Sequence, residues 1–162
     1  MAVLLRSRTR RFRMRRVPLT SVAQRILNAA GVASAELSLE LVGDRRMRGL
    51  NREYRHRDCP TDVLAFPMRE GCGPKTPLLG DVVVSLETAL RQAQSRGHSL
   101  DEELVRLLTH GVLHLVGYDH ESGAAEASRM RRKEQAVRRS LGRIPKLIQR
   151  SALSSQLNLR RS

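Results

Sequence analysis

The chain has 162 residues, 40% hydrophobic and with only two Tyr, two Phe and no Trp, which fits one domain with an aliphatic core. No apolar run approaches the length of a membrane helix and no signal-like apolar stretch follows the start, so we expect neither a membrane protein nor a secreted one. The net charge of +14 is concentrated at the ends: residues 1–20 carry +7, residues 121–162 carry +8, and residues 21–120 carry −1.

The basic ends allow two interpretations that the sequence leaves open. They contact the phosphates of a nucleic acid, or they are solvated segments with no partner. An Arg-rich start without acids also resembles a mitochondrial transit peptide, but Val3-Leu4-Leu5 fits a first strand better, so we expect a cytoplasmic protein. In that compartment Cys59 and Cys72 are expected as free thiols rather than as a disulfide. We predict one metallo-hydrolase domain over residues 1–143 and a basic tail over residues 144–162, either disordered or in contact with RNA.

The predicted elements mix strands and helices without strict alternation. Apolar and polar residues alternate over residues 35–42, which is typical of a half-buried strand. Further strands are predicted at residues 2–6, 63–66 and 82–84, and a Gly- and Pro-rich loop at residues 70–80. Helices are predicted from Pro18 to Gly31 and at residues 44–55, 86–97, 100–116 and 122–141. This order predicts an α+β fold, with a mixed sheet of about four strands and helices packed on it.

The helix at residues 100–116 carries the most informative motif. It is apolar nearly all round, which indicates a central, buried helix. His110 and His114 are one turn apart on one face, so their imidazoles can converge on one ion. Gly117 can end the helix and turn the chain back, which lets His120 approach as a third ligand. Three neutral imidazoles leave one tetrahedral position open, the arrangement of a catalytic rather than a structural zinc site.

The spacing of these histidines is that of the metzincin peptidases, His-Glu-x-x-His-x-x-Gly-x-x-His. Gly111 stands where those peptidases carry the glutamate that acts as general base. Because glycine has no proton acceptor, the motif keeps the metal ligands and lacks the base for peptide cleavage.

A second cluster of interest contains Arg52, Arg55 and Arg57, at the end of the helix at residues 44–55 and in the loop after it. A guanidinium can hold a phosphate through two hydrogen bonds. The same residues also suit a solvated helix C-terminus, where the helix dipole favours positive charge. Composition alone does not choose between these two interpretations.

The sequence resembles the YbeY family of bacterial endoribonucleases over roughly residues 36–135. Four stretches carry the resemblance, with support from Gly97-His98-Ser99 and Glu103: Leu50-Asn51 to Tyr54-Arg55, Pro60-Thr61-Asp62-Val63-Leu64-Ala65-Phe66-Pro67, Gly80-Asp81-Val82, and His110-Gly111 to Gly117-Tyr118-Asp119-His120. The chain departs from the family in its Arg-rich start, in its tail after Arg143, and in Ala65, where the family usually has Ser.

The resemblance implies one zinc ion per chain, on His110, His114 and His120, and a functional arginine at Arg55. It also implies an α+β fold and cleavage of single-stranded RNA in ribosomal RNA maturation and ribosome quality control, with the ribosome or its proteins as partners. Zinc would polarise a phosphate oxygen or supply hydroxide, and Arg55 would neutralise charge in the transition state. The nucleophile, water or the neighbouring 2′-hydroxyl, stays open.

Two other classes of function compete with this hypothesis. One is a zinc peptidase-like hydrolase with an unusual base, which Gly111 disfavours. The other is a non-catalytic ribosome-assembly protein that uses the metal for stability and its basic ends for RNA. Replacing His114 with Ala and measuring both folding and RNA cleavage separates these hypotheses. Loss of the fold would favour the non-catalytic protein, and loss of cleavage by a folded protein would favour the endoribonuclease.

Overall fold

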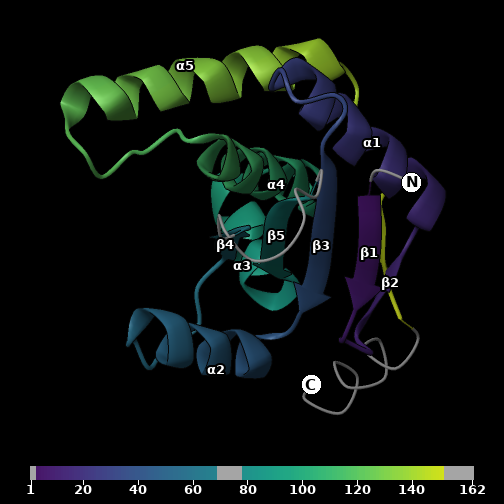
Figure 1. Ribbon diagram of the computed structural model, residues 1–162. Helices are drawn as coiled ribbons and strands as arrows, with labels where there is room; N and C mark the ends of the chain where they lie inside the picture. Colours follow the sequence, from purple (N-terminus) through teal and green to yellow (C-terminus); the bar gives the residue numbers. More distant parts are fainter. Residues whose placement is uncertain (1–2, 69–77, 152–162) are drawn as a thin grey trace.

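A mixed four-stranded sheet forms the centre of the protein (Figure 1). The computed structural model describes residues 3–68 and 78–151. The strand order is β1-β3-β5-β4, with β1, β3 and β5 parallel and β4 antiparallel to β5. The strands are β1 (Val3–Ser7), β3 (Glu36–Val42), β4 (Val63–Pro67) and β5 (Leu78–Ser85). The predicted α+β class with a four-stranded mixed sheet is confirmed.

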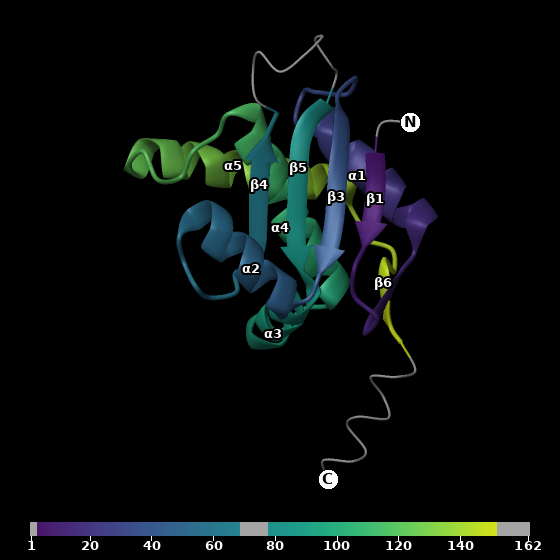
Figure 2. The same ribbon diagram turned by 60° about the horizontal axis from the view of Figure 1, so that its bottom comes forward.

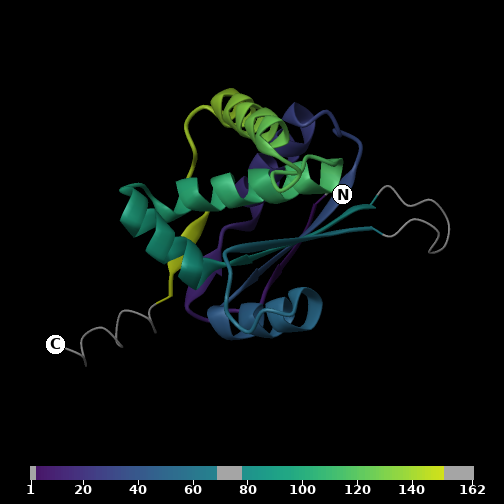
Figure 3. The ribbon, with the colours of Figure 1, turned by 90° about the vertical axis from the view of Figure 1, so that its left-hand side faces the viewer.

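Helices cover the two faces of the sheet unequally. Seen along the sheet, α2 covers one face alone, while α1, α4 and α5 lie on the other (Figure 3). From the side of α2 these three helices lie behind the strands (Figure 2). The helices are α1 (Arg16–Ala29), α2 (Asp44–Arg55), α3 (Leu86–Arg96), α4 (Leu100–Val116) and α5 (Ala124–Leu141). None of the helices within residues 3–68 and 78–151 has the length and hydropathy needed to cross a bilayer.

The core is divided by the sheet because side chains alternate along each strand. On β5, Val82 and Val84 belong to the large cluster shared with α1 and α4. Val83, between them, belongs to a smaller cluster with Leu64 and Met47 beneath α2. The sheet is therefore buried by several helices on one face and only partly covered on the other.

Helix α4 is the central, buried helix that its sequence predicts. Ser99 caps its N-terminus by accepting a hydrogen bond from the Glu102 amide at 3.1 Å, and three acidic residues in the first turn complement the helix dipole. Gly117 ends it in the left-handed conformation, and the Tyr118 amide donates back to the Leu113 carbonyl at 3.0 Å. This Schellman-like end fixes where the chain leaves the helix toward His120.

Two short strands were not predicted. β2 (Phe12–Met14) and β6 (Ile148–Arg150) pair antiparallel in a separate two-stranded sheet. Leu147, just before β6, is fully buried in the main core. The first part of the segment predicted as a tail thus packs against the domain, and residues 152–162 lie outside the described residues.

The predicted loop at residues 70–80 is wrong for its last three positions. Residues 78–80 belong to β5, and residues 70–77 lie outside the described residues, as does Cys72, while Cys59 is exposed. Gly80 is counted in the predicted loop, but its φ is +154°, and a Cβ there would lie 2.4 Å from the Phe66 carbonyl oxygen. This glycine allows β4 and β5 to approach closely inside the sheet.

Candidate metal centre

The three predicted histidines meet at the C-terminal end of α4. Their ring centroids are 4.8–5.1 Å apart, and one ligand atom from each lies within 4.8 Å of the others. His114 Nε2 lies 3.0 Å from His120 Nδ1. Two nitrogens bound to one tetrahedral zinc ion lie about 3.3 Å apart, so this cluster could hold a metal with small side-chain adjustments.

The loop that carries His120 is held by its own side chains. Asp119 accepts a hydrogen bond from the Glu121 amide at 2.8 Å and another from the Ser122 hydroxyl. These two hydrogen bonds, from Ser122 first and then from Glu121, lower the pKa of Asp119. Arg129 Cζ lies 5.0 Å from the ring centroid of Tyr118, over the face of the ring. This contact connects the loop to α5.

Glu134 on α5 contacts the candidate metal centre, and the sequence analysis missed it. Its Oε1 lies 2.6 Å from His110 Nδ1, and both side chains are largely buried. A carboxylate at Nδ1 holds the proton there and leaves Nε2 free to bind a metal. No sequence signal identifies Glu134, because it lies 24 residues from His110 in a strongly basic helix.

The surroundings of His114 favour its neutral imidazole. Burial lowers the pKa of His114, and the neighbouring His110 and His120 lower it further, with a smaller contribution from Arg55. Asp119 opposes this shift. A neutral imidazole is the form that binds a metal ion.

The histidines open into a cavity of about 490 Å³ between α4, β4 and the loop after α2. Arg55 and Arg57 line this cavity together with the three histidines, whereas Arg52 lines a different hollow. In the described residues Arg55 has no ion pair, so its charge is available to a ligand. The cavity therefore combines a candidate metal centre with free guanidinium groups.

The loop that follows α2 is positioned by Asn51. This buried amide donates to the Cys59 carbonyl at 2.8 Å, and the backbone carbonyl of Asn51 accepts from the Arg57 amide. His56 ends α2 in the left-handed conformation, with φ of 58°. The Leu-Asn-x-x-Tyr-Arg motif thus fixes the helix end that presents Arg55.

A hydrogen-bonded network supports Asp62, which also lines the cavity. Gln92 donates to Asp62 Oδ2 at 3.2 Å and accepts from Arg106, which in turn contacts the fully buried Glu103. Burial alone would raise the pKa of Glu103, but hydrogen bonds from Arg106 and His98 outweigh it and hold the pKa below its usual value. His98 is thus a partner of this carboxylate and does not line the cavity.

Gly111 lies where α4 packs so closely against the sheet that no side chain fits. A Cβ at this position would lie 2.8 Å from Val82 Cγ1 and 3.5 Å from Val63 Cγ2. Helix α4 can lie this close to the sheet only without a side chain there. A glutamate at position 111 would push α4 away and displace the histidines on either side.

We expect Gly111→Ala to lower the free energy of unfolding by up to about 2 kcal/mol. Overpacking against the stiff, buried Val82 costs about 1–3 kcal/mol, and the better helix propensity of alanine offsets about 1 kcal/mol. Gly49→Ala is the matched control, because Gly49 lies inside α2 and a Cβ added there would have nothing within 4 Å, so this variant should be stabilised. Urea unfolding of both variants checks this, and destabilisation of equal size at both positions would contradict it.

Comparisons with known proteins show the family of the chain. The family model described as Endoribonuclease YbeY matches residues 6–142. The chain belongs to the YbeY family. The match extends beyond the residues 36–135 that carry the sequence resemblance, and it includes residues 6–20, so the expectation that the Arg-rich start departs from the family is wrong for these residues. The predicted family is confirmed.

Curated YbeY relatives cover most of the chain. A protein named Endoribonuclease YbeY from Anaeromyxobacter sp. is 52% identical over 137 residues, 85% of this chain and 67% of that protein. The protein of that name from Geobacter metallireducens is 47% identical over 140 residues, 85% of this chain and 93% of that protein. The solution structure of a Thermotoga maritima protein superimposes with a TM-score of 0.59 over 86% of this chain and 89% of that one, at 23% identity, which shows the shared fold.

Proposed function

We propose that this YbeY-family chain is an endoribonuclease that cleaves single-stranded RNA with one zinc ion per chain. The name of the family and of its curated relatives supports the reaction. The observation that carries the proposal is the convergence of His110, His114 and His120 in a cavity that also contains an unpaired Arg55. A set of three imidazoles with one open side fits zinc better than magnesium or calcium, which prefer oxygen ligands.

The chain's own residues bind and orient the substrate around the metal. A zinc ion, when bound, supplies Lewis acidity at the phosphate. Arg55 donates to the phosphate oxygens and stabilises the negative charge that increases in the transition state. Glu134 orients His110, and Asn51 positions the loop that carries Arg57. The proposed cellular role is ribosomal RNA maturation and ribosome quality control, with the ribosome or its proteins as partners.

The peptidase alternative is disfavoured by the packing of Gly111, because the close contact with Val82 leaves no room for a glutamate base. The non-catalytic alternative predicts that the metal stabilises the fold and that the protein does not cleave RNA. Incubation of single-stranded RNA with the zinc-loaded protein tests the proposal directly. We expect cleavage that a chelator abolishes and added zinc restores, and intact RNA in the presence of zinc would contradict the proposal.

A second prediction concerns Glu134 as a positioning residue for His110. We expect Glu134→Ala to weaken zinc binding by about 10–100-fold, because His110 loses the carboxylate that fixes its ring. Glu134→Gln retains an acceptor at the same place and should lose less. Competition with a chromophoric chelator measures the affinity.

The matched control is Glu126→Ala, which removes a carboxylate from the first turn of the same helix, where it pairs only with Arg129 at 3.8 Å among the described residues. This control should bind zinc like the parent protein. Equal zinc affinity in the Glu134 and Glu126 variants would show that the contact with His110 has no role in the metal centre.

A further inference from the structure

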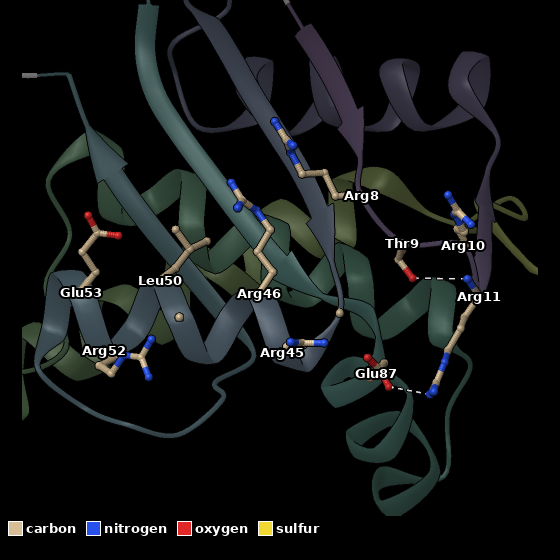
Figure 4. A pocket seen from close by; sticks show the side chains of 12 residues that line it. Arg8, Thr9, Arg10, Arg11, Arg45, Arg46, Leu50, Arg52, Glu53 and Glu87 are labelled. Carbon is tan, nitrogen blue, oxygen red and sulfur yellow. Dashed lines mark hydrogen bonds and ion pairs between the residues drawn. The ribbon is translucent and has the colours of Figure 1, made fainter.

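A second, strongly basic cleft lies away from the histidines, between α2 and the segment that joins β1 and β2 (Figure 4). Its volume is about 1010 Å³, and none of the three histidines lines it. Six arginines and two glutamates are among its lining residues; the arginines are Arg8, Arg10, Arg11, Arg45, Arg46 and Arg52. Half of these arginines come from the Arg-rich start, which the fold brings against α2.

Several of these positive charges are not neutralised. Arg8 and Arg46 share a single carboxylate, that of Glu40, at 2.8 and 3.2 Å. In the part of the chain that the structure describes, Arg10 and Arg45 form no ion pair, and both are exposed. Arg45 lies on α2 at the cleft (Figure 4). The cleft therefore presents an excess of guanidinium groups that suits a ligand with several phosphates.

A chain of shared lining residues connects this cleft to the metal centre. A hollow of about 620 Å³ on the α2 side of the sheet shares Leu50 with the arginine cleft. The same hollow shares Arg55 and Ala65 with the histidine cavity. Arg45 and Arg55 are ten residues apart on α2, which corresponds to about 15 Å along the helix axis. A flexible, extended polyanion could follow α2 from one end to the other.

The hollow between the two sites contains an exposed aromatic ring. Tyr54 is 55% exposed, and its ring centroid lies 5.1 Å from that of Phe66. Two of the four aromatic residues of the chain thus line the same hollow. Exposed aromatic rings beside a basic groove are the usual platform for unpaired bases.

We propose that the α2 face guides single-stranded RNA to the metal centre, with Arg10 and Arg45 binding phosphates remote from the cleaved bond and Tyr54 stacking on a base. This proposal rests on the proposed function and names residues beyond those of the cleavage site. The combination of spaced guanidinium groups with an aromatic ring favours a single-stranded nucleic acid. An acidic protein or an anionic membrane would use the charges but not the ring.

The test is equilibrium binding of RNA of two lengths, about 4 and about 16 nucleotides, which bracket common single-strand site sizes. Fluorescence anisotropy of 2′-O-methyl RNA in chelator measures binding without cleavage. We expect Arg10→Gln with Arg45→Gln to weaken binding of the longer RNA about tenfold at physiological salt and to reduce its salt slope by about 1.4, or about 0.7 per lost phosphate contact. Binding of the shorter RNA should change less.

Tyr54→Leu separates stacking from charge. It keeps an apolar contact with Phe66 and removes the ring, so affinity for the longer RNA should fall while the salt slope stays that of the parent. The matched control is Arg138→Gln with Arg139→Gln, two exposed arginines in the last turn of α5. This control removes the same charge from the other side of the sheet and should keep the parent's affinity and slope.

Equal affinities and slopes for the Arg10/Arg45 variant and the α5 control would overturn the proposal. Poly-glutamate or phosphatidylserine vesicles that bind the cleft as tightly as the longer RNA would also overturn it, in favour of an acidic protein or a membrane. Because the binding assay does not measure cleavage, its result is independent of the proposed reaction. Failure of the zinc-loaded parent to cleave RNA contradicts that reaction and leaves the binding result intact.

Discussion

His114→Ala is expected to reduce RNA cleavage by at least about a thousandfold and to remove the bound metal. The ring centroid of His114 lies 4.8 Å from that of His110 and 5.0 Å from that of His120, and its Nε2 is 3.0 Å from His120 Nδ1. Loss of one of three protein ligands leaves too few to retain zinc, and metal catalysis is worth several kcal/mol of transition-state stabilisation. About 4 kcal/mol corresponds to a thousandfold change in rate. Cleavage kinetics and metal analysis of the same preparation check this result.

The matched control is His56→Asn. His56 is exposed, does not line the cavity, and has a left-handed backbone that asparagine tolerates well. It should cleave RNA and bind zinc like the parent protein. If His114→Ala unfolds the protein, the metal has a structural role, as the non-catalytic hypothesis requires. If it keeps full activity, the three histidines are not the catalytic metal site.

Arg55→Ala is expected to lower the turnover rate by about 10²–10³-fold without loss of zinc. Removal of one preorganised donor from a site of developing charge costs about 2.7–4 kcal/mol. The guanidinium lines the histidine cavity but is not a metal ligand, so the metal content should be that of the parent protein. The loss should fall mainly on kcat, because the interaction strengthens in the transition state.

Arg55→Lys distinguishes charge from geometry at this position. Lysine keeps the positive charge but lacks the planar fork that binds two phosphate oxygens, so activity should be restored only in part. Arg138→Ala removes an exposed arginine from α5 and serves as the control for net charge. Loss of zinc in Arg55→Ala would assign Arg55 a structural role, and an unchanged turnover rate would remove it from the mechanism.

The sequence predicts the centre of the fold because that part is encoded locally. Apolar residues nearly all round residues 100–116 predict a buried helix, and α4 has these bounds. Alternation over residues 35–42 predicts β3 to within one residue. β2 and β6 could not be predicted, since each has three residues and exists only by pairing with the other across most of the chain.

The same difference applies to the candidate site. His110, His114 and His120 lie within eleven residues of sequence, and a helix followed by a glycine turn is enough to bring them together. Glu134 contacts His110 only because α5 folds back over α4, and a glutamate in a strongly basic helix gives no signal of that contact. The arginine cleft was hidden for a similar reason, because Arg8 and Arg10 look like part of a solvated basic end until β1 places them beside α2.

The most direct test of the proposed metal centre is a zinc titration of the metal-free protein, with RNA cleavage measured at each addition. The proposal gives one zinc site per chain, on the three convergent histidines, so activity should rise in proportion to added zinc and stop rising at one equivalent. X-ray absorption of that sample should show nitrogen ligands at about 2.0–2.1 Å. Full cleavage by the metal-free protein, or activity that does not follow zinc occupancy of these histidines, would contradict the account.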